Sequence, residues 1–385
     1  APREEFEAVS ACIFEHPELA FQEKMAQNEL CSLLERHGFS VKRGAGSLDT
    51  AFVAEYNSGK PGMTFAFLCE YDALPELGHA CGHNLISSAG FAAALGLKEA
   101  FQEKGTVIVY GTPAEELEGS KHYILEGGYM DEVDLMLASH YGSDWGSEVM
   151  GKAIVWPTHD NWVTFKGRAS HASSSPEKGR SALDAVILTT MGLEFLREHM
   201  PETNRIHYII SKGGTAANSV PDLATLNVEL RTNDSAELNS LMKRVDNVIK
   251  GAALMTDTTP VYRWDAPWYC ATPVPTLYRR AARYAADLGI DSSRFTFGNL
   301  PKASSDLGCV AYKIPTVEIT FPIVPDGEPA PVGHADETAC ITGNEYPIDQ
   351  SILAGKLMAL TGLRIGGNKE ELDLIQSEFA SHFRE

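Results

Sequence analysis

Long apolar runs and paired cysteines are both missing from this sequence of 385 residues. No stretch approaches the roughly 18 uninterrupted apolar residues that a membrane-spanning helix needs. The N-terminal stretch APREEFEAVS is charged and lacks the apolar core of a secretory signal. The seven cysteines are scattered and form no CxxC pair, as is typical of a reducing compartment. We therefore expect a soluble, cytoplasmic protein with no membrane partner.

Positive charge is also scarce. Lys and Arg number 32 against 52 Asp and Glu, so the net charge is -20. Nucleic acid and anionic membrane surfaces are therefore excluded as expected partners. The acidic surface favours solubility, and it is compatible with neutral or cationic substrates. Repeats and low-complexity tracts are absent, and the length suits two domains rather than one core.

The first and last parts of the chain alternate strands with helices. Continuous apolar runs are typical of strands buried on both faces. Such strands are expected at 63–69, 106–110, 135–140 and 315–321, with helical segments at 3–37 (interrupted near HPEL) and 86–101. This alternation predicts an α/β domain with a mostly parallel sheet.

Residues 160–264 have a different pattern. In LATLNVELRT (223–232), apolar and polar residues alternate, which predicts a sheet with one covered face. Strands are expected at 161–167, 205–211, 223–232 and 259–264, and helices at 181–200 and 235–254. The order β-α-β-β-α-β is that of a ferredoxin-like unit. We predict a smaller ferredoxin-like domain, 158–265, inserted into a larger α/β domain formed by 1–157 and 266–385.

Polar side chains follow three of the buried strands. Because the carboxyl ends of parallel strands meet at one edge of a sheet, ligand sites form there. The residues expected at this edge are Asp72, Cys81, His83, Glu115, Glu116 and His140. A lone His or Cys usually has only a packing role. Several polar groups that converge in a buried place need a partner.

Thiolate, imidazole and carboxylate are the ligands of zinc and related divalent ions. Gly82 allows the backbone to turn both Cys81 and His83 inward. We interpret Asp72 as the acceptor for a ligating imidazole, and His79 as a residue that positions the loop. Of the adjacent Glu115 and Glu116, one can bind metal while the other stays free as a general base.

Six motifs, in order along nearly the whole chain, resemble one known family: CEYDALPELGHACGHN, GTPAEE, LASHYG, GRASHAS, ANSVPD and VGHADE. They are similar to the two-metal aminoacylase and carboxypeptidase G family of metallopeptidases, in its amidohydrolase branch. The variants CGHN and CEYDALP resemble the β-alanyl-lysine dipeptidase and aminobenzoyl-glutamate hydrolase side of that branch. The resemblance implies a two-metal catalytic domain, an inserted lid and dimerisation domain, and a homodimer.

The resemblance also implies a role for each matched residue. Cys81 would bridge two divalent metal ions, and Glu115 would be the general base. His83 and His140 would hold one metal, and Glu116 and His334 the other. Zinc suits these ligands, and manganese or cobalt can occupy such a mixed site.

Three residues of the inserted domain match substrate-binding positions of the family. His171 would polarise the scissile carbonyl, in many members from the partner subunit. Asn218 and Arg231 would engage the substrate's carboxylate or its reacting carbonyl. A guanidinium on the polar face of its strand can bind a carboxylate bidentately; for Arg231 the alternative is a surface salt bridge, and for His171 an exposed loop histidine.

The expected activity is metal-dependent hydrolysis of the amide bond in a dipeptide or N-acyl amino acid with a free carboxylate. A β-alanyl-lysine-type dipeptide is favoured, and aminobenzoyl-glutamate or another N-acyl amino acid is the alternative. Two other classes stay open: a cysteine hydrolase that uses Cys81 with His83, and a non-catalytic protein that binds a small metabolite.

Overall fold

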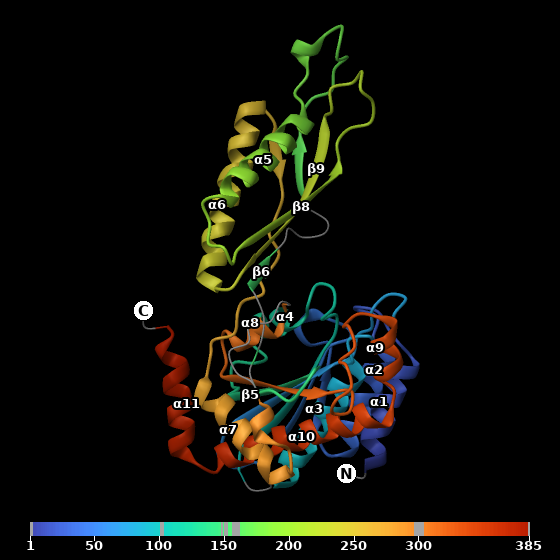
Figure 1. The fold of residues 1–385 in the computed structure, drawn as a ribbon, viewed down its shortest axis with the longest axis vertical. Coiled ribbons are helices and arrows are strands. Elements are labelled where there is room, and N and C mark those ends of the chain that lie inside the picture. The colour runs from blue at the N-terminus through green and yellow to red at the C-terminus, as the bar shows by residue number, and fades with distance from the viewer. Residues whose placement is uncertain are drawn as a thin grey trace. The chain divides into compact units, whose positions relative to one another are not determined.

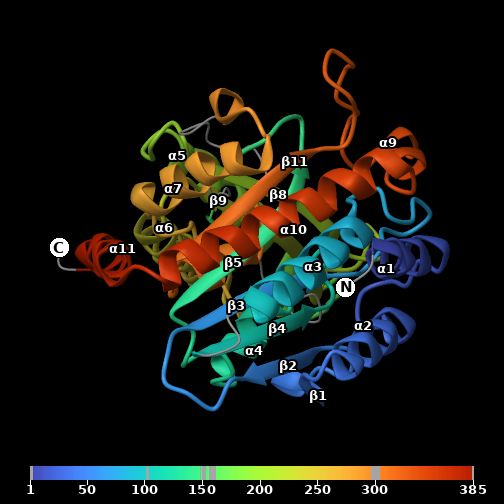
Figure 2. The same ribbon diagram turned by 90° about the horizontal axis from the view of Figure 1, so that it is seen from below.

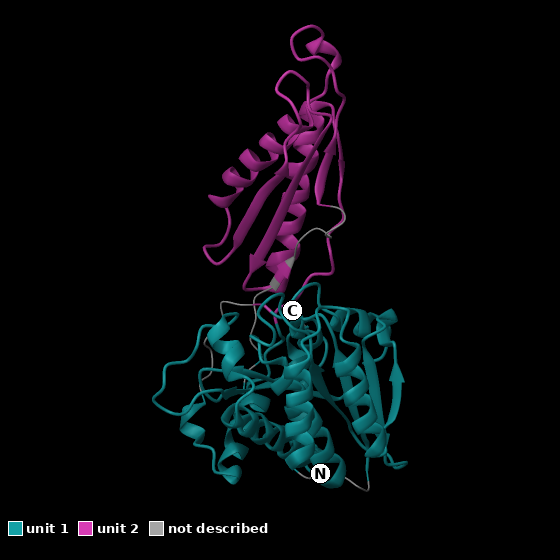
Figure 3. Cartoon of the chain, turned by 90° about the vertical axis from the view of Figure 1, so that its right-hand side faces the viewer, with its two compact units in different colours: residues 1–150, 271–300, 305–385 teal, residues 151–270, 301–304 magenta. Residues whose placement is uncertain are grey.

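The computed structural model describes residues 3–100, 104–147, 149, 153–155, 162–295 and 304–383. The chain forms two compact units (Figure 3). Unit 1 comprises residues 1–150, 271–300 and 305–385, and unit 2 comprises 151–270 and 301–304. The expected domain boundary at 157/158, the first residue of the expected strand 161–167 and the last of the expected helix 86–101 lie outside the described residues.

Unit 1 is built on a six-stranded sheet with the order β1-β2-β4-β3-β5-β11. Its strands are β1 (Ser40–Arg43), β2 (Phe52–Asn57), β3 (Thr64–Glu70), β4 (Thr106–Thr112), β5 (Leu135–Gly142) and β11 (Thr316–Pro322). The strands β4, β3, β5 and β11 are parallel, whereas β1 and β2 are antiparallel to their neighbours. The predicted mostly parallel α/β sheet is confirmed, and β1 and β2 extend it.

Helices cover both faces of this sheet. They are α1 (Arg3–Glu15), α2 (Lys24–Arg36), α3 (His83–Ala100), α4 (Lys121–Glu126), α7 (Pro275–Ala285), α8 (Leu307–Ala311), α9 (Asp336–Ile341), α10 (Glu345–Gly366) and α11 (Lys369–Ser381). The helices α3 and α10 lie side by side across the parallel strands (Figure 2). Among the described helices, none combines the length and the apolar composition that crossing a bilayer would require.

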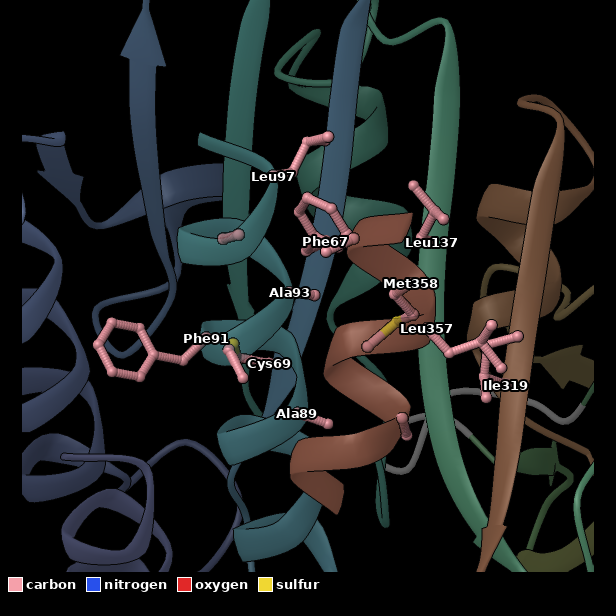
Figure 4. Packing of buried hydrophobic residues seen from close by; sticks show 14 of the residues in the cluster. Phe67, Cys69, Ala89, Phe91, Ala93, Leu97, Leu137, Ile319, Leu357 and Met358 are labelled. Atoms are coloured by element: carbon pink, nitrogen blue, oxygen red, sulfur yellow. The ribbon is translucent and has the colours of Figure 1, made fainter. Parts of the chain in front are cut away.

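The buried strands point alternate side chains into two hydrophobic clusters. Phe65 and Phe67 of β3 join the cluster under α3 and α10, whereas Ala66 and Leu68 join the one that includes α4 and α8. Figure 4 shows Phe67, Leu137 and Ile319 of three neighbouring strands with Leu357 and Met358 of α10. Two covered faces explain why these strands are continuously apolar in sequence.

Unit 2 contains a second sheet and two helices (Figure 1). Its elements are β6 (Ala153–Val155), β7 (Val163–Lys166), α5 (Ala182–Arg197), β8 (Arg205–Lys212), β9 (Leu223–Thr232), α6 (Ser235–Thr256) and β10 (Thr259–Val261). The order β10-β7-β9-β8 is that of a ferredoxin-like unit, with β6 paired to the C-terminal end of β9. The predicted β-α-β-β-α-β order is confirmed, and β6 is an addition. The helices begin at capped positions, where Ser181 accepts from the N–H of Asp184 and Asp234 from that of Glu237.

The contact between α3 and β3 depends on Gly90. A Cβ atom at Gly90 would lie 2.2 Å from the carbonyl oxygen of Leu68 and 2.9 Å from the sulfur of Cys69. We predict that Gly90→Ala lowers the free energy of unfolding by about 1–3 kcal/mol, because the helix must move away from the strand. Gly251→Ala, in α6 with no atom within 4 Å, is the control and should raise it by roughly 0.5–1 kcal/mol. Thermal and denaturant unfolding measure both, and an unchanged Gly90→Ala variant would contradict this packing.

Candidate active site

Asp72 connects two of the loops that follow the parallel strands. It lies two residues after β3 and is 1% exposed. Its Oδ1 accepts a hydrogen bond from His83 Nδ1 at 3.0 Å, and its Oδ2 accepts one from the backbone N–H of Glu116 at 3.0 Å. Burial alone would raise the pKa of Asp72, but His83 and these N–H donors hold it below its usual value.

The two imidazoles expected at the site have the same orientation. His83 is the first residue of α3, and its Nδ1–H donates to Asp72. His140 lies within β5, where its Nδ1–H donates to the carbonyl oxygen of Tyr141 at 2.8 Å. In both rings the Nε2 lone pair is therefore free to bind a cation. The sulfur of Cys81 lies 3.6 Å from His140 Nε2.

Three carboxylate oxygens face His83 Nε2. The distances from this nitrogen are 3.5 Å to Glu70 Oε2, 3.8 Å to Glu116 Oε1 and 4.0 Å to Glu115 Oε2. The buried atoms His83 Nε2, Glu70 Oε2 and Glu116 Oε1 have no hydrogen-bond partner in the part of the chain that the structure describes. Buried acceptors that face one another without a shared hydrogen need a cation between them.

The potential ligand atoms form three overlapping groups, within each of which all atoms lie within 4.8 Å of one another. The groups are Cys81, His83 and His140; Cys81, Glu116 and His334; and His83, Glu115 and Glu116. Ligand atoms on one tetrahedral zinc ion lie about 3.3–3.8 Å apart. The separations of 3.6 Å between Cys81 and His140 and 3.4 Å between Glu116 and His334 fit this range. The donor set therefore fits divalent metal ions, and Cys81 belongs to two of the groups.

The electrostatics of the site also favour a bound cation. Burial raises the pKa of the Cys81 thiol, so a thiolate there needs a neighbouring positive charge. Burial, and next the charge of Glu70, raise the pKa of Glu115 well above its usual value. A carboxyl group with a raised pKa is suited to accept and return a proton near neutral pH.

His171 and Asn218 are neighbours in unit 2, in two exposed loops that pair with each other. The backbone N–H of Ala172 donates to the carbonyl oxygen of Asn218 at 2.9 Å. The ring Nδ1 of His171 accepts from the backbone N–H groups of Ser173 and Ser174, each at 3.3 Å. Its Nε2 therefore carries the hydrogen and can donate to a carbonyl oxygen.

Arg231 lies on the less buried face of β9, and its Nε donates to Glu229 Oε1 at 2.7 Å. The salt bridge that sequence reasoning gave as the alternative for Arg231 is therefore present within unit 2. The loop with His171 and Asn218 lies at the opposite end of the same strand, next to the paired residues Lys166 and Leu223. Roughly 25 Å of extended strand separates Arg231 from that end.

Sequence reasoning missed three buried charged residues near this site: Glu23, Glu70 and Lys121. Glu70 had a visible signal, because an acidic residue directly follows a fully apolar strand. Glu23 and Lys121 reach the site from segments distant in sequence, so spacing gave no sign of them. His140 was expected after its strand and instead lies inside β5, and α3 begins at His83 rather than at residue 86.

Comparisons with known proteins agree with the fold and the motifs. Residues 159–256 match the family model described as the peptidase dimerisation domain of M20. The Xaa-Arg dipeptidase of Mus musculus is 34% identical over 98% of this chain and 89% of its own length. A p-aminobenzoyl-glutamate hydrolase polypeptide of Escherichia coli is 37% identical over 74% of this chain and 62% of its own length. The Bacillus subtilis YXEP protein, a dinuclear metal-binding peptidase from the M20 family, has a similar structure with a TM-score of 0.69 at 18% identity, over 95% of this chain and 98% of that one.

These similarities define the class of the protein as a hydrolase. The chain belongs to the M20 family of metallopeptidases, the two-metal aminoacylase and carboxypeptidase G family, in its amidohydrolase branch. It is therefore an enzyme, and metal-dependent cleavage of amide bonds is its class of reaction.

Glu23 supports the loop that carries Glu115. It is fully buried, and its Oε1 accepts from the backbone N–H of Ala114 at 2.9 Å, where Ala114 has a φ of 59°. Burial raises the pKa of Glu23 to about 7 from 4.5. The folded protein therefore holds this proton more tightly than the unfolded chain does. The contribution of Glu23 to stability falls as the pH rises from about 4.5 to about 7, and it is constant above that range.

We predict that Glu23→Gln removes this pH dependence. The amide still accepts the Ala114 N–H but cannot ionise, so the stability of the variant relative to wild type should increase by about 2–3 kcal/mol between pH 5 and pH 8. Denaturant unfolding at several pH values measures this difference. Glu4→Gln, the same change at an exposed position of α1, is the control. Parallel curves for wild type and Glu23→Gln would contradict the assignment.

Proposed function

We propose that this enzyme hydrolyses the amide bond of a dipeptide or N-acyl amino acid that carries a free carboxylate, with two divalent metal ions bound in unit 1. The observation that carries the proposal is the set of buried, unpartnered acceptors around His83 Nε2 among the described residues, flanked by a thiol shared between two ligand groups. Such a set is stable only with cations, and a base in the same place is available for hydrolysis.

Five residues would hold the metal ions. We assign Cys81 as the bridging ligand, His83 and His140 to one ion, and Glu116 and His334 to the other. This division is supported by the two groups that share Cys81. Zinc suits these ligands best, and manganese or cobalt is the alternative. When bound, the metal ions lower the pKa of water and polarise the scissile carbonyl.

The remaining steps are assigned to side chains of the protein. Glu115 takes a proton from the attacking water and later delivers it to the leaving amine. The Nε2–H of His171 donates a hydrogen bond to the carbonyl oxygen, on which negative charge develops as water adds. Asn218 and Arg231 bind the polar ends of the substrate. For Arg231 this requires exchange of the Glu229 carboxylate for that of the substrate.

A dipeptide with a basic C-terminal residue, of the β-alanyl-lysine type, is the favoured substrate. It is supported by the similarity to Xaa-Arg dipeptidases over nearly the whole chain and by the net charge of -20. Aminobenzoyl-glutamate is the alternative, supported by the second relative. Hydrolysis assays that compare C-terminal lysine, arginine, ornithine, alanine and glutamate with aminobenzoyl-glutamate distinguish them. Preference for an acidic leaving group would reject the dipeptidase assignment.

We further propose that the active enzyme is a homodimer in which each site uses residues of both copies. His171 and Arg231 lie at opposite ends of β9 and cannot both contact one small substrate from a single unit 2. Unit 2 also has exposed apolar side chains on α5 and the adjacent β8, namely Ile187, Met191, Phe195, Ile209 and Ile210. Such a continuous apolar surface is suited to self-association. Localisation in the cytoplasm is also part of the proposal and rests on the unpaired cysteines.

Replacing the proposed base separates chemistry from metal binding. We predict that Glu115→Gln keeps its metal content but loses about 10²–10⁴-fold in kcat, because the amide cannot take the proton from water. Elemental analysis and turnover on the same preparation measure both quantities. Glu118→Gln, in the same loop but outside the three ligand groups, is the control. Near-normal turnover in Glu115→Gln would remove Glu115 from this role.

Replacing the proposed bridging ligand should remove the metal as well as the activity. We predict that Cys81→Ala loses metal, whereas Cys31→Ala, a buried thiol of α2 outside the ligand groups, retains it. Full metal retention in Cys81→Ala would refute the bridging role. A cysteine hydrolase would also lose activity in Cys81→Ala, but it would be insensitive to chelators. Loss of activity on chelation and recovery with zinc, manganese or cobalt excludes that class.

Complementation between two inactive variants tests the shared site. If His171 acts on the partner's site, a heterodimer of His171→Ala and Glu115→Gln chains contains one complete site and one doubly defective site. Co-expressed chains with different tags, purified by both tags, should then have about half of the wild-type kcat per dimer. No recovery in a confirmed heterodimer would mean that His171 acts within its own chain, and sedimentation of an active monomer would reject the dimer.

A further inference from the structure

A fully buried lysine lies behind the proposed metal site. Lys121 is the first residue of α4 and is 0% exposed. Its Nζ donates to Glu70 Oε1 at 2.8 Å and to Asp306 Oδ1. A buried ammonium group is stable only when it is paired, and here two carboxylates share it.

Asp306 fixes the position of this lysine. Its Oδ2 accepts from the backbone N–H groups of Ser120 at 2.8 Å and Lys121 at 3.0 Å. The same residue immediately precedes α8, so α4, α8 and the lysine side chain are tied to one carboxylate. Because Lys121 is held at both its backbone and its ammonium group, the oxygen of Glu70 that it binds is held as well.

The second oxygen of Glu70 points the other way. Glu70 Oε2 lies 3.5 Å from His83 Nε2, and neither atom has a hydrogen-bond partner among the described residues. The proton of His83 is on Nδ1, which donates to Asp72. Glu70 therefore has one oxygen neutralised by Lys121 and one oxygen facing the nitrogen that would bind metal.

We propose that Glu70 is a positioning residue of the metal site, held by Lys121 so that its free oxygen supplies negative charge to the cation bound by His83 and accepts hydrogen bonds from water on that cation. The inference rests on the proposed two-metal function. Glu70 does not belong to the three ligand groups of the described residues, so it acts from outside the set of direct ligands. Residues in such positions orient and tune a metal centre.

Two substitutions of the same chemical type separate this role from a structural one. Glu70→Gln removes the charge that faces His83 but leaves Lys121 paired with Asp306. Asp306→Asn removes the other carboxylate of the same lysine but leaves Glu70 in place. If Glu70 acts on the metal, Glu70→Gln should weaken Zn²⁺ binding by about 10–100-fold and change the unfolding temperature of the metal-free protein little. Asp306→Asn should lower that temperature and weaken Zn²⁺ binding much less.

Zn²⁺ affinity is measured on the metal-free full-length proteins by competition with a chromophoric chelator, and the unfolding temperature is measured on the same samples. Asp134→Asn is the control, because Asp134 accepts from the N–H of Thr64 at the opposite end of β3. Equal loss of Zn²⁺ affinity in Glu70→Gln and Asp306→Asn, or wild-type affinity in Glu70→Gln, would overturn the inference while leaving the proposed function intact. A wild-type protein that binds no Zn²⁺, Mn²⁺ or Co²⁺ would overturn both.

Discussion

The arrangement of the site depends on one buried carboxylate, that of Asp72. One of its oxygens holds the ring of His83 and the other holds the backbone of Glu116, so two loops from adjacent parallel strands are fixed by a single group. The hydrogen bond to His83 also selects the tautomer, which leaves Nε2 with its lone pair directed at the carboxylates. Without Asp72, the imidazole could rotate and the loop with the paired glutamates would lose its anchor.

A concentration of buried negative charge is the main electrostatic problem of this unit. Glu70, Asp72, Glu115 and Asp306 are all buried, and Lys121 is the buried cation that the structure describes among them. One lysine cannot balance them. Bound metal ions would supply the remaining positive charge, which would make metal binding part of the stability of the unit as well as of its chemistry. The Cys81 thiol has the same requirement, since burial disfavours its thiolate until a cation is present.

Much of this could be predicted from the sequence, for a physical reason. Strands buried on both faces are continuously apolar, so 64–70, 106–112, 135–142 and 316–322 were recognisable, and polar residues after them had to meet at one edge. The alternating strand 223–232 identified the one-sided sheet of unit 2 in the same way. The short strands β1, β2 and β6 have no comparable apolar signal and were missed. Lys121 and Asp306 were also missed, because their pairing joins residues 185 positions apart and leaves no periodic trace.

The roles of individual residues follow from geometry only in unit 1, where distances of 3.0–4.0 Å connect Asp72, His83, Glu115 and Glu116. For unit 2 the structure gives an internal constraint, the length of β9 between His171 and Arg231, and this favours a site completed by two chains. The two units therefore make different contributions. Unit 1 provides the ligands and the base, and unit 2 provides hydrogen-bond donors and the surface for self-association.

Metal content measured together with turnover tests the central claim most directly. Elemental analysis of the purified protein, with hydrolysis of basic, neutral and acidic dipeptides and of aminobenzoyl-glutamate assayed on the same sample, should give about two divalent ions per chain and cleavage of the amide bond. A stable protein that holds no metal and stays inactive after addition of zinc, manganese or cobalt would contradict the account, because the buried acceptors around His83 would then be satisfied without a cation.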